Sequence, residues 1–246
     1  MPWCARSWST RFTSVHIVVR HGGRELAGVA REGEPWAAAA RRIAATVPGQ
    51  VVARDLSNDP LLFEVDSEHT VALRAAVHGD LPDLVRWRQS APVLRWWASD
   101  GEPTPERVAE QYGPDIDGMT ATRLWIAEVN GRSLGFVQDY RIGAHPGFAL
   151  LAPDPDAIGV DYAIGEEQWI GKGLGRRLLW AWMLRTRHRC PDAVAYFAAP
   201  DHRNEPSLRT LEHVGFTRGL WFDEPQSDGS VATVVGCTLD VPRVLG

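Results

Sequence analysis

Hydrophobic and polar residues follow two kinds of pattern between about residue 69 and the C-terminus. Short apolar runs bounded by Gly, Pro, Asn or Asp predict β-strands, and apolar residues that recur every three or four positions predict amphipathic helices. The predicted strands are 70–75, 124–129, 133–140, 159–164, 193–198, 216–222 and 231–239, and the predicted helices are 81–89, 104–112, 173–187 and 204–213. Strands and helices that alternate in this order predict an α/β fold built on a mixed sheet.

Several boundaries of these elements have a local chemical cause. Asp80 is a suitable N-cap for the helix at 81–89, and Pro105 suits the first position of the next helix. Asn130 and Gly131 supply the positive φ angles of a type I′ turn. They therefore predict a hairpin between the strands at 124–129 and 133–140.

The N-terminal 68 residues carry weaker signals. Residues 1–14 contain no acidic residue and are expected to be disordered. Two strands, at 15–20 and 25–30, flank a His-Gly-Gly-Arg turn, and an alanine-rich helix is expected at 36–46. We therefore divide the chain into residues 1–14, an N-terminal α/β extension of unknown role at 15–68, and a main domain at 69–246.

The composition narrows the class of protein and of partner. Hydrophobic residues make up 44% of the chain and charged residues 23%, and the formal net charge is −5. This balance is typical of a globular protein, argues against nucleic acid as a partner and favours a cationic substrate. The three cysteines, Cys4, Cys190 and Cys237, form no CxxC pair, so neither a disulfide framework nor a metal site is expected.

No apolar run is long enough to span a membrane, and the N-terminus lacks the apolar stretch of a secretory signal. We therefore expect no membrane partner and a cytoplasmic location. A homodimer is left open, because nothing in the sequence decides the oligomeric state.

Three closely spaced glycines, Gly171, Gly173 and Gly175, lie between a predicted strand and a long predicted helix. Glycine permits φ > 0 and a close approach of the backbone to a ligand, and the free N–H groups at a helix start attract anions. Lys172 and Arg176 add positive charge at the same place. This segment predicts a phosphate cradle, and hence a phosphorylated ligand.

The spacing of these glycines excludes two common nucleotide motifs. No Ser or Thr follows Lys172, as a P-loop would require, and the third glycine stands two residues after the second, not the three of a dinucleotide fingerprint. The remaining pattern, Gln-x-x-Gly-x-Gly from Gln168, resembles the acyl-CoA pyrophosphate loop of the GCN5-related N-acetyltransferases. The resemblance implies that family's fold, acetyl-CoA (coenzyme A) as cosubstrate, and a small-molecule amine as acceptor.

Further segments between about residues 70 and 240 are similar to the aminoglycoside 6′-N-acetyltransferase branch of that family. They are residues 93–97, 108–112, 130–138, 159–161 and 215–216. By position, the branch implies that a set of residues around the loop binds the cosubstrate: Ile164, Gln168, Ile170, Gly171, Lys172, Gly173, Leu174, Gly175, Arg176 and Asn204. Asn204 is equally well explained as the N-cap of the following helix.

The same resemblance implies roles in acceptor binding and chemistry. Asp161 matches the carboxylate beside the amine that is acetylated, where an anion can attract the ammonium and a base can take its proton. Trp96 and Trp97 resemble a tryptophan pair that flanks the amino-sugar, and Tyr112 belongs to a neighbouring matched segment. Asp228 matches a second acid of the branch, although Asp-Gly is also what a tight hairpin requires.

The chain departs from the family where most members place a tyrosine as proton donor to the leaving thiolate, because it has Leu211 there. Water, or Ser207 one helical turn earlier, is the expected replacement. Residues 199–216 are also similar to siderophore-pathway acyltransferases, which act on a lysine or hydroxylysine amine. A third alternative is a non-catalytic acyl-CoA-binding module.

Overall fold

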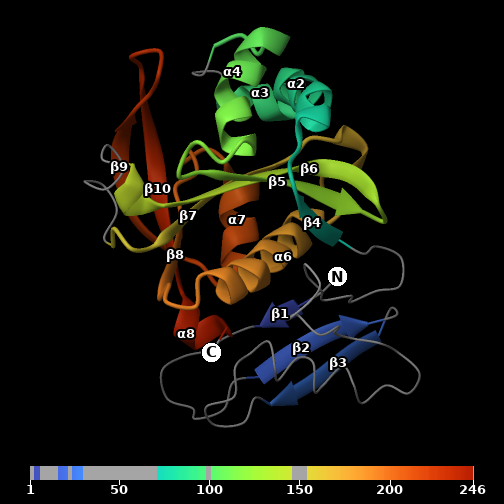
Figure 1. Cartoon of the computed structure of the whole chain (residues 1–246). Helices are drawn as coiled ribbons and strands as arrows, with labels where there is room; N and C mark the ends of the chain where they lie inside the picture. Colours follow the sequence, from blue (N-terminus) through green and yellow to red (C-terminus); the bar gives the residue numbers. More distant parts are fainter. Residues whose placement is uncertain are drawn as a thin grey trace.

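The chain folds around one seven-stranded sheet with helices on both faces (Figure 1). The computed structural model describes residues 71–97, 101–145 and 154–245, and the backbone of 3–5, 16–21 and 24–29. The strand order is β4-β5-β6-β7-β8-β10-β9. The strands are β4 (Val71–Ala75), β5 (Arg123–Val129), β6 (Arg132–Arg141), β7 (Ile158–Ile164), β8 (Ala195–Ala198), β9 (Thr217–Pro225) and β10 (Val231–Asp240).

The helices form two layers, with α2, α3 and α4 over one face of the sheet and α6 and α7 over the other (Figure 1). The α-helices are α2 (Leu81–Gln89), α3 (Ala91–Trp97), α4 (Pro105–Ile116), α6 (Leu174–Arg189), α7 (Glu205–His213) and α8 (Val241–Leu245). Short 3₁₀ turns are η1 (His78–Asp80), η3 (Ile142–Ala144) and η4 (Glu167–Trp169).

Alternation along the central strands explains why both faces are covered. In β5, Leu124 and Ile126 pack into the cluster beneath α2, α3 and α4, whereas Trp125 and Ala127 pack against α6. Side chains of a strand point alternately to its two faces, so a strand that is apolar at successive positions needs a layer on each side. The predicted α/β fold with a mixed sheet is confirmed.

One buried carboxylate ties the sheet to α6. Asp139 on β6 is 1% exposed, accepts hydrogen bonds from the indole N–H groups of Trp125 (2.7 Å) and Trp182 (3.0 Å), and pairs with Arg189 (2.7 Å). A buried charge is tolerated only when it is paired and hydrogen-bonded. This network therefore holds α6 against the sheet.

Neighbouring strands pair in antiparallel fashion except β7 and β8, which are parallel. That parallel pairing involves only Ile158 with Tyr196 and Gly159 with Phe197, although β7 pairs with β6 as far as Ile164. The two strands consequently diverge in the middle of the sheet. The opening lies where β7 leads into the glycine-rich loop.

The N-terminal part contains a separate three-stranded sheet of β1 (Trp3–Ala5), β2 (His16–His21) and β3 (Arg24–Val29). The predicted hairpin is confirmed by the antiparallel pairing of β2 with β3. Strand β1 lies inside the segment expected to be disordered and pairs with β2. The helix predicted at 36–46 lies outside the described residues.

Candidate functional site

The opening between β7 and β8 is the floor of a cleft of about 1090 Å³. Its walls come from α3, from β6 and β7, from the loop before α6, from α7 and from the last hairpin, β9–β10. Many of the residues singled out in the sequence line it: Trp96, Trp97, Asp161, Ile164, Ile170, Gly171, Gly173, Leu174, Gly175, Arg176, Asn204 and Ser207.

The glycine-rich loop has the backbone geometry expected of an anion cradle. Gly171 and Gly173 have φ of +75° and +76°, and Gly173 is the N-cap of α6 with no side chain to cap the helix. A Cβ at Gly171 would meet no other atom, so the backbone conformation is the reason for glycine there. Helix α6 is 16 residues long and directs its free N–H groups toward the cleft end lined by Arg176.

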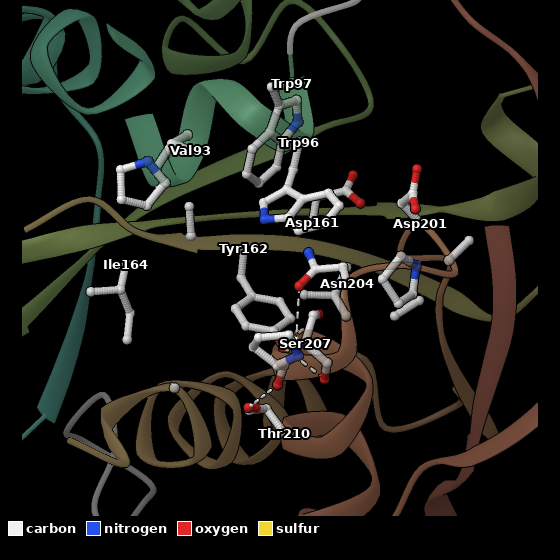
Figure 2. A pocket seen from close by; sticks show the side chains of 18 of the residues that line it. Val93, Trp96, Trp97, Asp161, Tyr162, Ile164, Asp201, Asn204, Ser207 and Thr210 are labelled. Atoms are coloured by element: carbon white, nitrogen blue, oxygen red, sulfur yellow. Dashed lines mark hydrogen bonds between the residues drawn. The ribbon is translucent and has the colours of Figure 1, made fainter. Parts of the chain in front are cut away.

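On the opposite wall, a hydroxyl group of α7 lies beside a hydroxyl group of β7. The Asn204 Oδ1 accepts a hydrogen bond from the Ser207 amide (3.2 Å), so this asparagine caps the helix as well as lining the cleft. The Ser207 hydroxyl lies 2.9 Å from that of Tyr162 on β7. Figure 2 shows the two side chains on their respective elements. Burial raises the pKa of Tyr162, which therefore stays protonated. Leu211 is fully buried in the core and does not line the cleft.

Asp161 lies on the other side of the cleft, between the tryptophans of α3 and the residues of α7 (Figure 2). Its paired residue on β6 is Gln138, and the hydroxyl of the diagonal neighbour Tyr140 donates a hydrogen bond to the Asp161 carboxylate. Burial and this carboxylate raise the pKa of Tyr140 well above its usual value, so the phenol remains a donor.

Gly159 makes the contact between Tyr140 and Asp161 possible. It stands opposite Tyr140 in the β6–β7 pairing, and a Cβ at Gly159 would lie 2.6 Å from Cε2 of the Tyr140 ring. The ring therefore occupies the space that a larger residue would fill. Sequence reasoning missed Tyr140; the absence of a side chain two positions before Asp161 was the available signal.

The last hairpin adds a second acid that sequence reasoning also missed. Glu224 on β9 is partly buried and lines the cleft, and Gln226 Nε2 donates to its Oε2 (3.2 Å). Burial and the charge of Asp161 raise the pKa of Glu224 to about 7. The side chain therefore exchanges a proton near neutral pH.

The two tryptophans of α3 are partly exposed and share the cleft wall. Trp97 also packs against the core, with its ring centroid 5.7 Å from that of Phe136. The guanidinium of Arg95 lies over the Trp96 ring at 4.7 Å. An apolar, electron-rich wall thus faces Asp161, which suits a flat cationic ligand.

The structure places four of the sequence-derived site residues outside the cleft lining. Tyr112 is fully buried and its hydroxyl accepts a hydrogen bond from Arg88 (2.6 Å). Asp228 is exposed in the β9–β10 turn, where it accepts a hydrogen bond from the Ser230 amide (2.9 Å). Core packing therefore accounts for Tyr112, and the turn accounts for Asp228.

The other two flank the cradle. Gln168 donates to Glu166 (3.2 Å), and the Lys172 ammonium lies 4.8 Å from the centroid of the Trp169 ring. Both are exposed. Within residues 71–97, 101–145 and 154–245, no cluster of three or more His, Cys, Asp or Glu side chains could hold a metal ion, and no helix of the described chain is both long and apolar enough to cross a bilayer.

Comparison with known proteins places this cleft in a family. Residues 76–223 match the family model described as acetyltransferase (GNAT) domain. The chain is 29% identical over 155 residues to the aminoglycoside N(6′)-acetyltransferase type 1 of Klebsiella pneumoniae, covering 62% of this chain and 77% of that protein. It is 28% identical over 147 residues to the lysine N-acyltransferase MbtK of Mycolicibacterium paratuberculosis, covering 58% and 64%.

A solved structure agrees with the sequence relatives. The structure of AAC(6′)-Ib in complex with ribostamycin and coenzyme A superposes with a TM-score of 0.61 at 27% identity, over 69% of this chain and 93% of that one. The family match spans more than half of the 246 residues. The chain therefore belongs to the GNAT acetyltransferase family.

Proposed function

We propose that this protein transfers an acetyl group from acetyl-CoA to a primary amine, the 6′-amine of an aminoglycoside or a similar amino-sugar, by direct attack in a ternary complex. The observation that carries the proposal is the meeting, in one cleft, of a glycine cradle at a helix start and a carboxylate beside an aromatic wall. The names of the relatives support the acceptor class.

The residues at the cradle fit the diphosphate of acetyl-CoA. The positive φ angles of Gly171 and Gly173 turn main-chain N–H groups outward, and Arg176 supplies a cation at the same end of the cleft. The edge of β7 beyond Gly159 is free of β8 and is therefore available to pair with an extended arm. Bound there, acetyl-CoA supplies the activated thioester.

Asp161 is proposed to hold the acceptor ammonium in front of that thioester. The hydrogen bond from Tyr140 fixes the carboxylate, and Trp96 and Trp97 provide the surface on which a sugar ring stacks. Holding the nitrogen close to the reacting carbon replaces a bimolecular encounter by an oriented attack. This positioning is the main contribution asked of the acceptor wall.

Ser207 is proposed to donate a proton to the departing thiolate, because the Leu211 side chain is buried and has no acidic proton to donate. The Tyr162 and Ser207 hydroxyls are 2.9 Å apart, and in this proposal Tyr162 is the donor of that hydrogen bond, which leaves the serine O–H for the thiolate. The pair thus replaces the missing tyrosine with a hydroxyl on the same helix and a phenol on the facing strand.

Free thiol release tests the proposal when the purified chain and acetyl-CoA are screened against kanamycin-type amines, polyamines and lysine derivatives. Release with the kanamycin-type amines is expected. Release only with lysine derivatives would favour the activity named for the MbtK relative.

The variant Asp161→Asn separates an enzyme from a binding module. We expect it to lose turnover and to keep its acetyl-CoA affinity, measured by calorimetry. Coenzyme binding with no thiol release from any amine would contradict the transferase proposal.

A further inference from the structure

Glu224 is placed in the acceptor end of the cleft by the pleat of β9. Burial alternates along the strand's last residues, so Phe222 and Glu224 are turned inward while Asp223 and Pro225 are exposed. Phe222 packs against the small apolar cluster that Tyr140 also contacts. The next inward residue, Glu224, consequently reaches the same part of the cleft as the Tyr140–Asp161 pair.

The groups that act on Glu224 come from each element around it. Gln226, just beyond β9, donates an amide hydrogen bond, and the paired residue on β10 is the uncharged Ala232. Asp161 on β7 contributes a like charge, and Glu224 in turn acts on Tyr140 of β6. His145 contacts the Tyr140 ring edge-on at 4.7 Å.

The two carboxylates of the cleft have different partners. Asp161 accepts a hydrogen bond from the Tyr140 hydroxyl, and such a bond stabilises a carboxylate anion. Among the described residues, the Glu224 carboxylate accepts a hydrogen bond only from a neutral amide; it is also partly desolvated, and its pKa is raised to about 7. The raised pKa of Glu224 lets this acid exchange a proton at neutral pH beside a second carboxylate.

We propose that Glu224 is the general base of acetyl transfer, and that Asp161 is the anion that holds the acceptor ammonium. This inference rests on the proposed function. Glu224 takes one proton from the ammonium, directly or through one water. The freed lone pair forms the carbon–nitrogen bond as the carbon–sulfur bond breaks. The nitrogen then loses a second proton, which reaches the CoA thiolate through water or the Ser207 hydroxyl. Glu224 returns its own proton to solvent.

The pH dependence of kcat/KM tests the base directly. In the wild type we expect an ascending limb centred near pH 7, and in Glu224→Gln the loss of that limb with a fall of about 10²- to 10³-fold. Asp223→Asn is the matched control, because Asp223 is the adjacent acid on the outward face. An unchanged limb in Glu224→Gln would overturn the assignment.

A second acceptor distinguishes a base from a binding residue. An amine whose own pKa lies well below the assay pH, such as a fluorinated ethylamine, is already neutral and needs no base. The wild-type to Glu224→Gln rate ratio should then fall to within about threefold. An equal loss with both acceptors would mean that Glu224 only binds substrate.

A titration that needs no turnover completes the test. In the full chain labelled with carboxyl-¹³C glutamate, the signal absent from Glu224→Gln should titrate near pH 7 and shift lower in Asp161→Asn. Titration near the ordinary glutamate value would overturn the proposal even if the enzyme is active. A wild type that acetylates no amine would instead contradict the proposed function, and the base with it.

Discussion

The replacement of Gly159 by alanine tests the link between strand register and the site. The new Cβ would lie 2.6 Å from the Tyr140 ring and 3.0 Å from Cδ1 of Ile142. Carbon atoms in comfortable contact are about 3.5 Å apart, so the ring must retreat by roughly 1 Å. Ile142 is fully buried and cannot give way easily.

Two effects of Gly159→Ala follow from this displacement. Overpacking should lower the free energy of unfolding by about 1–3 kcal/mol in urea titrations. The hydrogen bond from the Tyr140 hydroxyl to Asp161 should also be lost, and a displacement of that size can lower kcat by up to about 10²-fold. Gly79→Ala is the control, because its Cβ would meet only Val77 Cγ2 at 3.9 Å.

A double-mutant cycle with Tyr140→Phe decides whether the activity loss passes through the phenol. If it does, Gly159→Ala should reduce kcat little further once the hydroxyl is gone. Fully additive losses in kcat would refute the reasoning, since they would mean that Gly159 and Tyr140 act on the site by separate routes.

Other consequences of the structure can be measured separately. Asp139→Ala should lower the free energy of unfolding by about 3–5 kcal/mol in urea titrations, because one guanidinium and two indole N–H groups lose a buried partner; a loss below 1 kcal/mol would contradict this network. Gly173→Ala places a Cβ at φ +76°, should cost about 1–2 kcal/mol, and should raise the acetyl-CoA Kd in calorimetry. Tyr162→Phe should lower kcat roughly tenfold at unchanged acetyl-CoA affinity, because the Ser207 hydroxyl loses its hydrogen-bond partner. Since the pKa of Glu224 is raised from 4.5 to about 7 in the folded state, folding holds a proton between those values and stability falls as the pH rises through them. Glu224→Gln should therefore be more stable than the wild type at pH 8, by about 1–2 kcal/mol once solvent screening of this partly exposed group is allowed for, with no advantage at pH 4.

Local chemistry made some elements predictable from sequence. The Asn130-Gly131 turn has positive φ at both residues, and the hairpin it predicts is formed by β5 and β6. Gly173, inside the predicted cradle, is the left-handed residue before α6. Each of these features depends on the φ preferences of one or two adjacent residues, which do not change with the fold.

Helix α3, from Ala91 to Trp97, was not predicted. The segment is too short for helical periodicity to be distinctive, and its side chains are stabilised by packing, as in the contact of Trp97 with Phe136 on β6. The family resemblance singled out the two tryptophans as candidate acceptor-binding residues without showing the element that carries them.

For Tyr112 and Asp228 the structure supplies a local role outside the cleft lining. Both were singled out by the family resemblance, but Tyr112 is buried in the core beside Arg88 and Asp228 accepts a hydrogen bond within a turn. A short sequence match records residue identity but not the direction of the side chain. That direction follows from packing and from hydrogen bonds made elsewhere in the chain.

The sequence by itself determined the alternation of strands and helices and the glycine-rich loop before α6, because both depend on residues that are neighbours along the chain. Only the tertiary structure decided which acids meet. The β6–β7 register brings Asp161 and Tyr140 together. Glu224 lines the same cleft because its side chain lies on the inward face of β9. Burial and charge then act on groups that are distant in sequence, and no local pattern encodes that proximity.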